Sequence, residues 1–132
     1  MALRDRFRRG GRRRTDGRAV ERASDAADAQ HLLDFIATRR GVEGFVEPRT
    51  TVTDTTLLLV AYDGEWTRRR VPSVAWAHDL ANRNGVPSYD AGLVGIPQRM
   101  REYNHRQRLR QKELLRSSLD QDERPDEEPE RR

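Results

Sequence analysis

The sequence contains no cysteine, which excludes a disulfide framework, thiolate metal ligation and dithiol redox chemistry. It contains a single lysine, Lys112, beside twenty-five arginines. This preference is weak evidence for function, because a GC-rich coding sequence produces it as readily as selection for phosphate contacts does. No apolar stretch approaches the length of a membrane span, and nothing resembles a signal peptide. We therefore expect a cytoplasmic protein.

The charge is spread unevenly along the chain of 132 residues. Residues 1–22 carry nine arginines and three acids, whereas residues 118–132 carry seven acids and three arginines. The intervening part is nearly neutral, and most apolar residues lie in it, between Leu32 and Tyr103. We therefore predict three parts, which are a disordered arginine-rich arm at 1–23, one folded domain at 24–118 and a disordered acidic tail at 119–132.

Three segments have the features of helices. Residues 26–40 repeat apolar side chains with the helical period, and Ser24 is available as their N-cap. Residues 74–84 show the same pattern after Ser73. The segment 97–119 begins with a proline, a residue favoured in the first turn of a helix. Because this segment contains many basic residues, we expect little of it to be buried beyond its first turns.

Four shorter segments have the features of strands, at residues 45–51, 55–62, 65–71 and 86–89. The second contains five consecutive apolar residues, which is typical of a central strand buried on both faces. The element order α-β-β-β-α-β-α predicts an α+β domain in which a small, three- to four-stranded, mainly antiparallel sheet is covered by helices. The disordered charged tails would flank this domain.

The dipeptide Asp63-Gly64 predicts a two-residue hairpin turn between the second and third strands. Such a turn would place Leu59 opposite Arg68 and Leu57 opposite Arg70. It would also put arginines on both faces of the third strand.

The sequence offers no clear catalytic constellation, so we assign no catalytic residue, no metal site and no cofactor. The three histidines, His31, His78 and His105, lack the close spacing of metal ligands. No Gly-x-Gly-x-x-Gly turn is present, and no serine or threonine lies in a nucleophile-elbow pattern. The acidic Asp63 is explained as a turn former. These observations favour a non-catalytic protein.

Three groups of basic residues are candidates for binding phosphate, in the arm, in the third strand and in the C-terminal helix. Trp66, which lies beside the arginines of the third strand, offers a surface on which a base could stack. The candidate nucleic-acid-binding residues are Arg8, Arg9, Arg12, Arg13, Arg14, Trp66, Arg68, Arg70, Arg99, Arg106, Arg108 and Arg110. The alternatives are a charged strand that prevents edge-to-edge pairing and a helix that is simply solvated. In the arm, Leu3 and Phe7 could also recruit an anionic membrane surface.

Three stretches carry a resemblance to a known group of proteins. They are Glu47-Pro48-Arg49-Thr50-Thr51, the segment from Asp63 to Pro72 and the segment from Pro97 to Asn104. Over about residues 31–107 the chain resembles a group of short actinobacterial proteins of unassigned function, some of which carry an automatic oxidoreductase label. The resemblance implies no particular catalytic or cofactor-binding residues.

The leading hypothesis is a small non-catalytic binding or adaptor protein that contacts RNA, a ribonucleoprotein or an acidic protein through arginine-rich surfaces. The first alternative is a small oxidoreductase with a site near Arg49, Arg68 and Tyr89. The second is a protein-interaction module. The sequence predicts neither the oligomeric state nor the identity of the partner.

Overall fold

The structure, a computed structural model, describes the backbone of residues 13–123 and the side chains of residues 25–123. The elements are α1 (Arg13–Thr38), β1 (Glu43–Glu47), β2 (Thr56–Val60), β3 (Trp66–Arg70), α2 (Val74–Arg83), β4 (Ser88–Asp90), α3 (Ala91–Val94) and α4 (Gln98–Asp122). The α+β class and the expected order of elements are confirmed. The short helix α3 lies between the last strand and the long helix, where we expected a loop.

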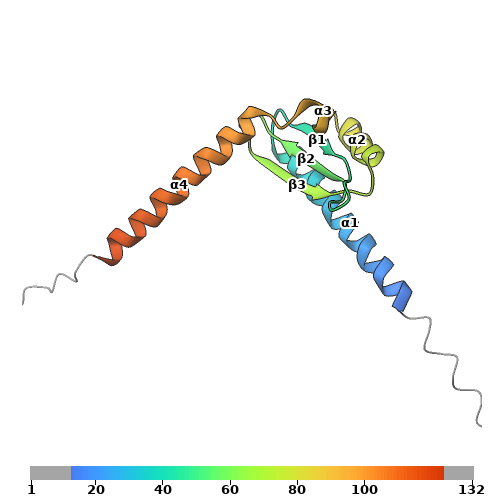
Figure 1. The fold of residues 1–132 in the computed structure, drawn as a ribbon, viewed down its shortest axis with the longest axis horizontal. Helices are drawn as coiled ribbons and strands as arrows, with labels where there is room; N and C mark the ends of the chain where they lie inside the picture. The colour runs from blue at the N-terminus through green and yellow to red at the C-terminus, as the bar shows by residue number, and fades with distance from the viewer. Residues whose placement is uncertain (1–12, 124–132) are drawn as a thin grey trace, which may run out of the picture.

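The four strands form one mixed sheet in the order β3-β2-β1-β4 (Figure 1). The pairs β1–β2 and β2–β3 are antiparallel, whereas β4 runs parallel to β1. The central strand β2 is buried on both faces, because Leu57, Leu58, Leu59 and Val60 have no exposed surface. β1 ends at Glu47, since the following residue, Pro48, lacks the N–H that a ladder requires.

Two apolar clusters pack against the two faces of the sheet. On one face, Leu32 and Phe35 of α1 and Ala77 and Ala81 of α2 pack against alternate residues of β2. The predicted N-cap of α2 is present, because the Ser73 hydroxyl accepts a hydrogen bond from a backbone N–H of the first turn. The opposite cluster contains Phe45, Leu58, Val60 and Met100, the last from the first turn of α4.

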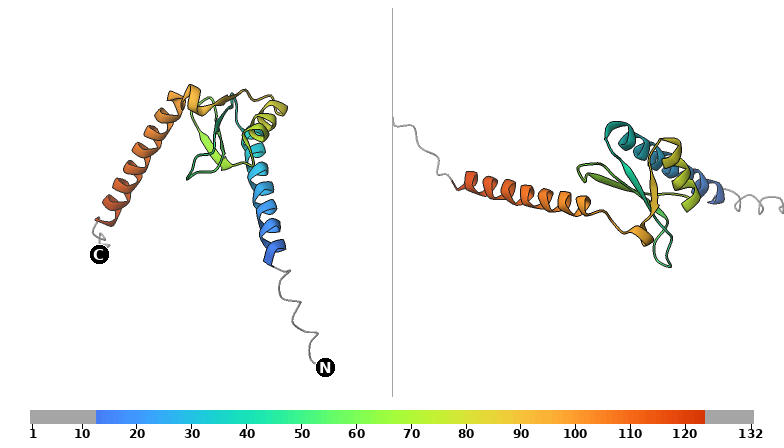
Figure 2. Two further views of the ribbon diagram at one scale, coloured as in Figure 1. Left: turned by 45° about the vertical axis from the view of Figure 1, so that its right-hand side comes forward. Right: turned by 90° about the horizontal axis from the view of Figure 1, so that it is seen from above.

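The two long helices extend well beyond this core. In Figure 1 the N-terminal half of α1 and most of α4 project from the sheet in different directions, so that the molecule has the outline of an open V. The two further views in Figure 2 show the same divergence. Among the residues described, no helix is long and apolar enough to cross a membrane.

Both long helices differ in length from the sequence-based expectation. α1 begins at Arg13, thirteen residues before the expected start at residue 26, and α4 continues past residue 119 to Asp122. Apolar periodicity marks only the part of a helix that packs on a core, so it misses a solvated extension. The boundaries predicted at residues 23 and 119 therefore fall inside helices. The predicted disorder of residues 1–12 and 124–132 lies outside the described residues.

The hairpin between β2 and β3 is present, but its register differs by one residue from the predicted one. Leu58, and not Leu59, lies opposite Arg68. The loop has three residues, Tyr62 to Gly64, because Ala61 pairs with Glu65 through a backbone hydrogen bond of 2.8 Å. Gly64 has φ +90°, the left-handed conformation that follows a tight turn in such loops. The predicted two-residue turn is therefore wrong.

This shift exchanges the faces of β3, since neighbouring residues of a strand point to opposite sides. Trp66, Arg68 and Arg70 lie on the face of Leu58, where α4 docks, and not on the face that α1 and α2 cover. Thr67 and Arg69 point to that helix-covered face. The expectation of arginines on both faces of the strand is confirmed.

Candidate nucleic-acid interface

Each arginine of β3 forms an ion pair with a carboxylate from another part of the fold. Arg68 pairs with Glu47, Arg69 with Asp28 and Arg70 with Asp54, at N–O distances of 2.6, 3.6 and 3.5 Å. The first pair is bidentate, since Arg68 Nη2 also donates to the second carboxylate oxygen at 3.3 Å. The charge of this strand is therefore largely balanced within the molecule.

Trp66 holds α4 against the sheet. Its indole Nε1 donates a hydrogen bond of 2.7 Å to Oδ1 of Asn104, and the ring packs beside the apolar cluster that contains Met100. The guanidinium carbon of Arg68 lies 5.4 Å from the ring centroid, within cation–π range. The aromatic surface that the sequence suggested for base stacking is thus engaged in contacts within the fold.

Two of the candidate arginines of α4 also anchor the helix. Arg99 donates from Nε to the carbonyl of Ala61 at 3.0 Å and forms an ion pair of 2.8 Å with Glu43. Arg106 donates to the carbonyl of Asp63 in the hairpin at 2.8 Å. Both side chains therefore fix the first three turns of α4 to the β2–β3 hairpin.

The other basic residues of α4 are exposed. Arg101, Arg108, Arg110, Lys112 and Arg116 have no ion-pair partner among the side chains that the structure describes. Four of them are separated by seven, four and four residues, which places them on one side of a helix with 3.6 residues per turn. We call Arg101, Arg108, Lys112 and Arg116 the basic stripe. It extends over about 22 Å of the helix axis, and Arg110 lies on the other side of α4.

The candidates in the N-terminal arm are only partly covered by the structure. Arg8, Arg9 and Arg12 lie outside the described residues, as do Leu3 and Phe7 of the suggested membrane contact. Arg13 and Arg14 form the start of α1, in a part of the helix for which only the backbone is described. Their role in binding remains a prediction.

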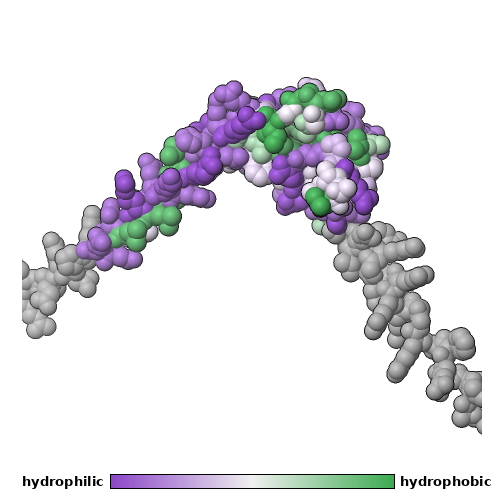
Figure 3. Space-filling view, in the orientation of Figure 1, coloured by the Kyte–Doolittle hydropathy of each residue, from purple (hydrophilic) through white to green (hydrophobic). Residues whose placement is uncertain are grey.

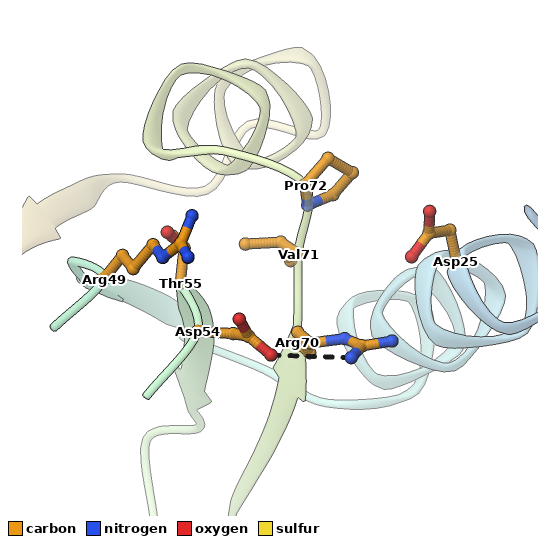
Figure 4. A pocket seen from close by; sticks show the side chains of 7 residues that line it. All are labelled: Asp25, Arg49, Asp54, Thr55, Arg70, Val71 and Pro72. Carbon is orange, nitrogen blue, oxygen red and sulfur yellow. Dashed lines mark hydrogen bonds and ion pairs between the residues drawn. The ribbon is translucent and has the colours of Figure 1, made fainter. Parts of the chain in front are cut away.

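The residues proposed for an oxidoreductase site do not share one cavity. Arg49 lines a cavity of about 300 Å³ between the β1–β2 connection and the end of β3, together with Asp25, Asp54, Thr55, Arg70, Val71 and Pro72 (Figure 4). Arg68 does not line this cavity and pairs with Glu47. Tyr89 packs on Phe45, with ring centroids 5.7 Å apart. The charges in the cavity balance, because two carboxylates accompany its two guanidinium groups.

Two histidines form short hydrogen bonds to hydroxyl groups. His31 Nε2 lies 2.6 Å from Thr67 Oγ1, and His78 Nδ1 lies 2.6 Å from Ser88 Oγ. Each bond joins a helix to an edge strand, α1 to β3 and α2 to β4. Within residues 25–123 no three histidine or carboxylate side chains gather as metal ligands. The geometry therefore explains both histidines as ties between the helices and the sheet.

A further ion pair, with an N–O distance of 2.7 Å, joins Arg39 at the end of α1 to Glu65 just before β3. The hydrogen bond that Arg39 donates to the Glu65 carboxylate raises the pKa of Arg39 above its ordinary value. Arg39 is therefore charged throughout the physiological range.

No family model, curated protein or solved structure matches the chain.

Proposed function

We propose that this chain is a non-catalytic RNA-binding protein that uses the basic stripe of α4 to contact a phosphate backbone. The observation that carries the proposal is the contrast between the two groups of arginines. Those on the sheet and in the first turn of α4 pair with carboxylates or carbonyls, whereas the stripe residues are exposed and have no such partner in the described part of the chain.

The form of the stripe favours a polyanion over a folded acidic protein. Its cations repeat every one to two helical turns, as suits a ligand with regularly spaced charges. The free energy of binding would come from counterions that the phosphates release when the guanidinium groups replace them.

The test measures the affinity for a fluorescently labelled single-stranded RNA by anisotropy over a range of salt concentrations. In the test variant, Arg108→Gln, Lys112→Gln and Arg116→Gln remove three cations from the stripe. We expect weaker binding and a log–log salt slope that is flatter by about 2, since each phosphate contact on a single strand contributes about 0.7. The arginines of the arm remain, so the difference reports on α4 alone.

A matched control removes the same charge elsewhere. Arg40, Arg49 and Arg83 are exposed on the globular part, and changing all three to Gln alters the net charge equally. The control should keep the salt slope of the parent within about half a unit. If the parent does not bind RNA at low salt, or if the two triple variants behave alike, the proposal is wrong.

A further inference from the structure

The distal part of α4 exposes leucines that have no partner within the fold. Leu114, Leu115 and Leu119 are each 64% exposed, and the apolar patches on this helix are visible in Figure 3. These residues lie more than one turn beyond Arg106, the last residue of α4 with a hydrogen bond to the hairpin. A solvated helical extension of this length is only marginally stable in water, so an external partner would stabilise it.

A charge-free face runs along this part of the helix. With 3.6 residues per turn, Gln107, Gln111, Leu114, Leu115 and Ser118 fall within about 100° of the circumference. No charged residue between 107 and 121 falls in this arc, and Asp122 lies in it at the C-terminal end of α4. We call these five residues the neutral face. It continues the side on which Met100 and Asn104 contact the core.

The charges on this part of α4 change sign along the helix axis. Residues 106–112 contain four basic residues and no acid, whereas residues 117–123 contain three acids and no base. A second α4 lying antiparallel, with its midpoint between Leu114 and Leu115, would bring each basic segment beside the acidic segment of the partner. A parallel arrangement would place like charges together, which is unfavourable.

From this complementarity we propose that the neutral face of α4 is the docking site for a second copy of the chain, paired antiparallel. The core limits how far the two α4 helices can overlap, because the core already covers this side of α4 up to Asn104. The free segment from 107 to 122 is centred between Leu114 and Leu115, which is the midpoint that the charge pattern requires. This inference does not depend on the proposed binding of RNA.

The first test is sedimentation equilibrium of the full chain between about 10 µM and 1 mM, where weak self-association becomes visible by mass action. We expect a concentration-dependent dimer. The double variant Leu114→Gln, Leu115→Gln should remain monomeric. The control variant Leu109→Gln, Leu93→Gln changes two exposed leucines outside the neutral face and should dimerise like the parent. A monomeric parent, or a dimer that persists in the first variant, would overturn the proposal.

The second test reports the orientation and uses the absence of native cysteine. In the antiparallel pair, Gln111 of one copy lies across from Ser118 of the other. A mixture of Gln111→Cys and Ser118→Cys chains should therefore form a mixed disulfide under a mild oxidant. Neither variant alone should crosslink, because the equivalent positions are about 10 Å apart along the axis, beyond disulfide reach. Crosslinking of each variant with itself would indicate a parallel pair and would also overturn the proposal.

Discussion

The contact between the β2–β3 hairpin and α4 depends on the absence of a side chain at residue 64. Gly64 has φ +90°, and a Cβ added there would lie 2.0 Å from the carbonyl oxygen of Arg99 and 2.8 Å from Cβ of Tyr103. The obstacle is mostly backbone, so a side-chain rotation cannot relieve it. We therefore expect Gly64→Ala to displace α4 from the sheet.

The cost has three parts, which are the backbone conformation of residue 64, the burial of Met100 and one hydrogen bond. The left-handed conformation costs an alanine about 1 to 2 kcal/mol. Displacing α4 exposes Met100, which is 5% exposed in the fold and whose burial contributes about 1.5 to 3 kcal/mol. The hydrogen bond from Trp66 to Asn104 adds about 1 kcal/mol. With partial relaxation, we expect Gly64→Ala to lower the free energy of unfolding by about 3 to 5 kcal/mol.

Urea unfolding followed by far-ultraviolet circular dichroism measures this change. Gly85 is the matched control, because it has φ +69° but an added Cβ would have no atom within 4 Å. Gly85→Ala should therefore cost only the conformational part, about 1 to 2 kcal/mol. Equal destabilisation by the two substitutions would show that the contact with α4 contributes nothing and would refute the reasoning.

Two further predictions concern the sheet. Leu59→Ala should lower the free energy of unfolding by about 2 to 4 kcal/mol, because the side chain is fully buried. Val52→Ala, at a residue that is 89% exposed, should change it by less than about 0.5 kcal/mol. Similar effects of the two substitutions in urea unfolding would contradict the placement of β2. Glu47→Gln should lower the stability by about 0.5 to 1 kcal/mol, since the ion pair with Arg68 is partly exposed. A double-mutant cycle with Arg68→Gln measures this coupling directly, and a coupling of zero would rule out an energetic role for the pair.

The fold follows from the sequence where one local signal decides the structure. The continuous apolar run identified β2 as the buried central strand, and Ser73 identified the start of α2. Asp63-Gly64 predicts the position of the hairpin, but this dipeptide is compatible with both a two-residue and a three-residue loop. In the three-residue loop Gly64 lies against α4, where an added Cβ would meet the carbonyl oxygen of Arg99. That contact joins segments about thirty-five residues apart and leaves no local signal.

The candidate interface also depends on contacts between distant segments, which the sequence does not reveal. A run of arginines in β3 and a run in α4 look alike as sequence. They differ in the structure because Glu47, Asp28 and Asp54 come to β3 from other elements, whereas α4 leaves the core. The stripe itself could have been found from the spacing of its residues. The sequence did not indicate that the arginines nearest the core, Arg99 and Arg106, serve to anchor the helix.

In the part of the chain that the structure describes, helix α4 is attached to the rest of the fold only near its N-terminal end, so a small tilt there produces a large displacement at its C-terminal end. Its contacts with the hairpin end at Arg106, and the helix then continues to Asp122 for about 24 Å. A tilt of about 10° at the attachment would move the far end by about 4 Å, while the atoms around Gly64 would move far less. Small rearrangements of the β2–β3 hairpin are therefore amplified at the tip of α4, and a ligand held there exerts its torque on the few contacts around Gly64, Trp66 and Arg99.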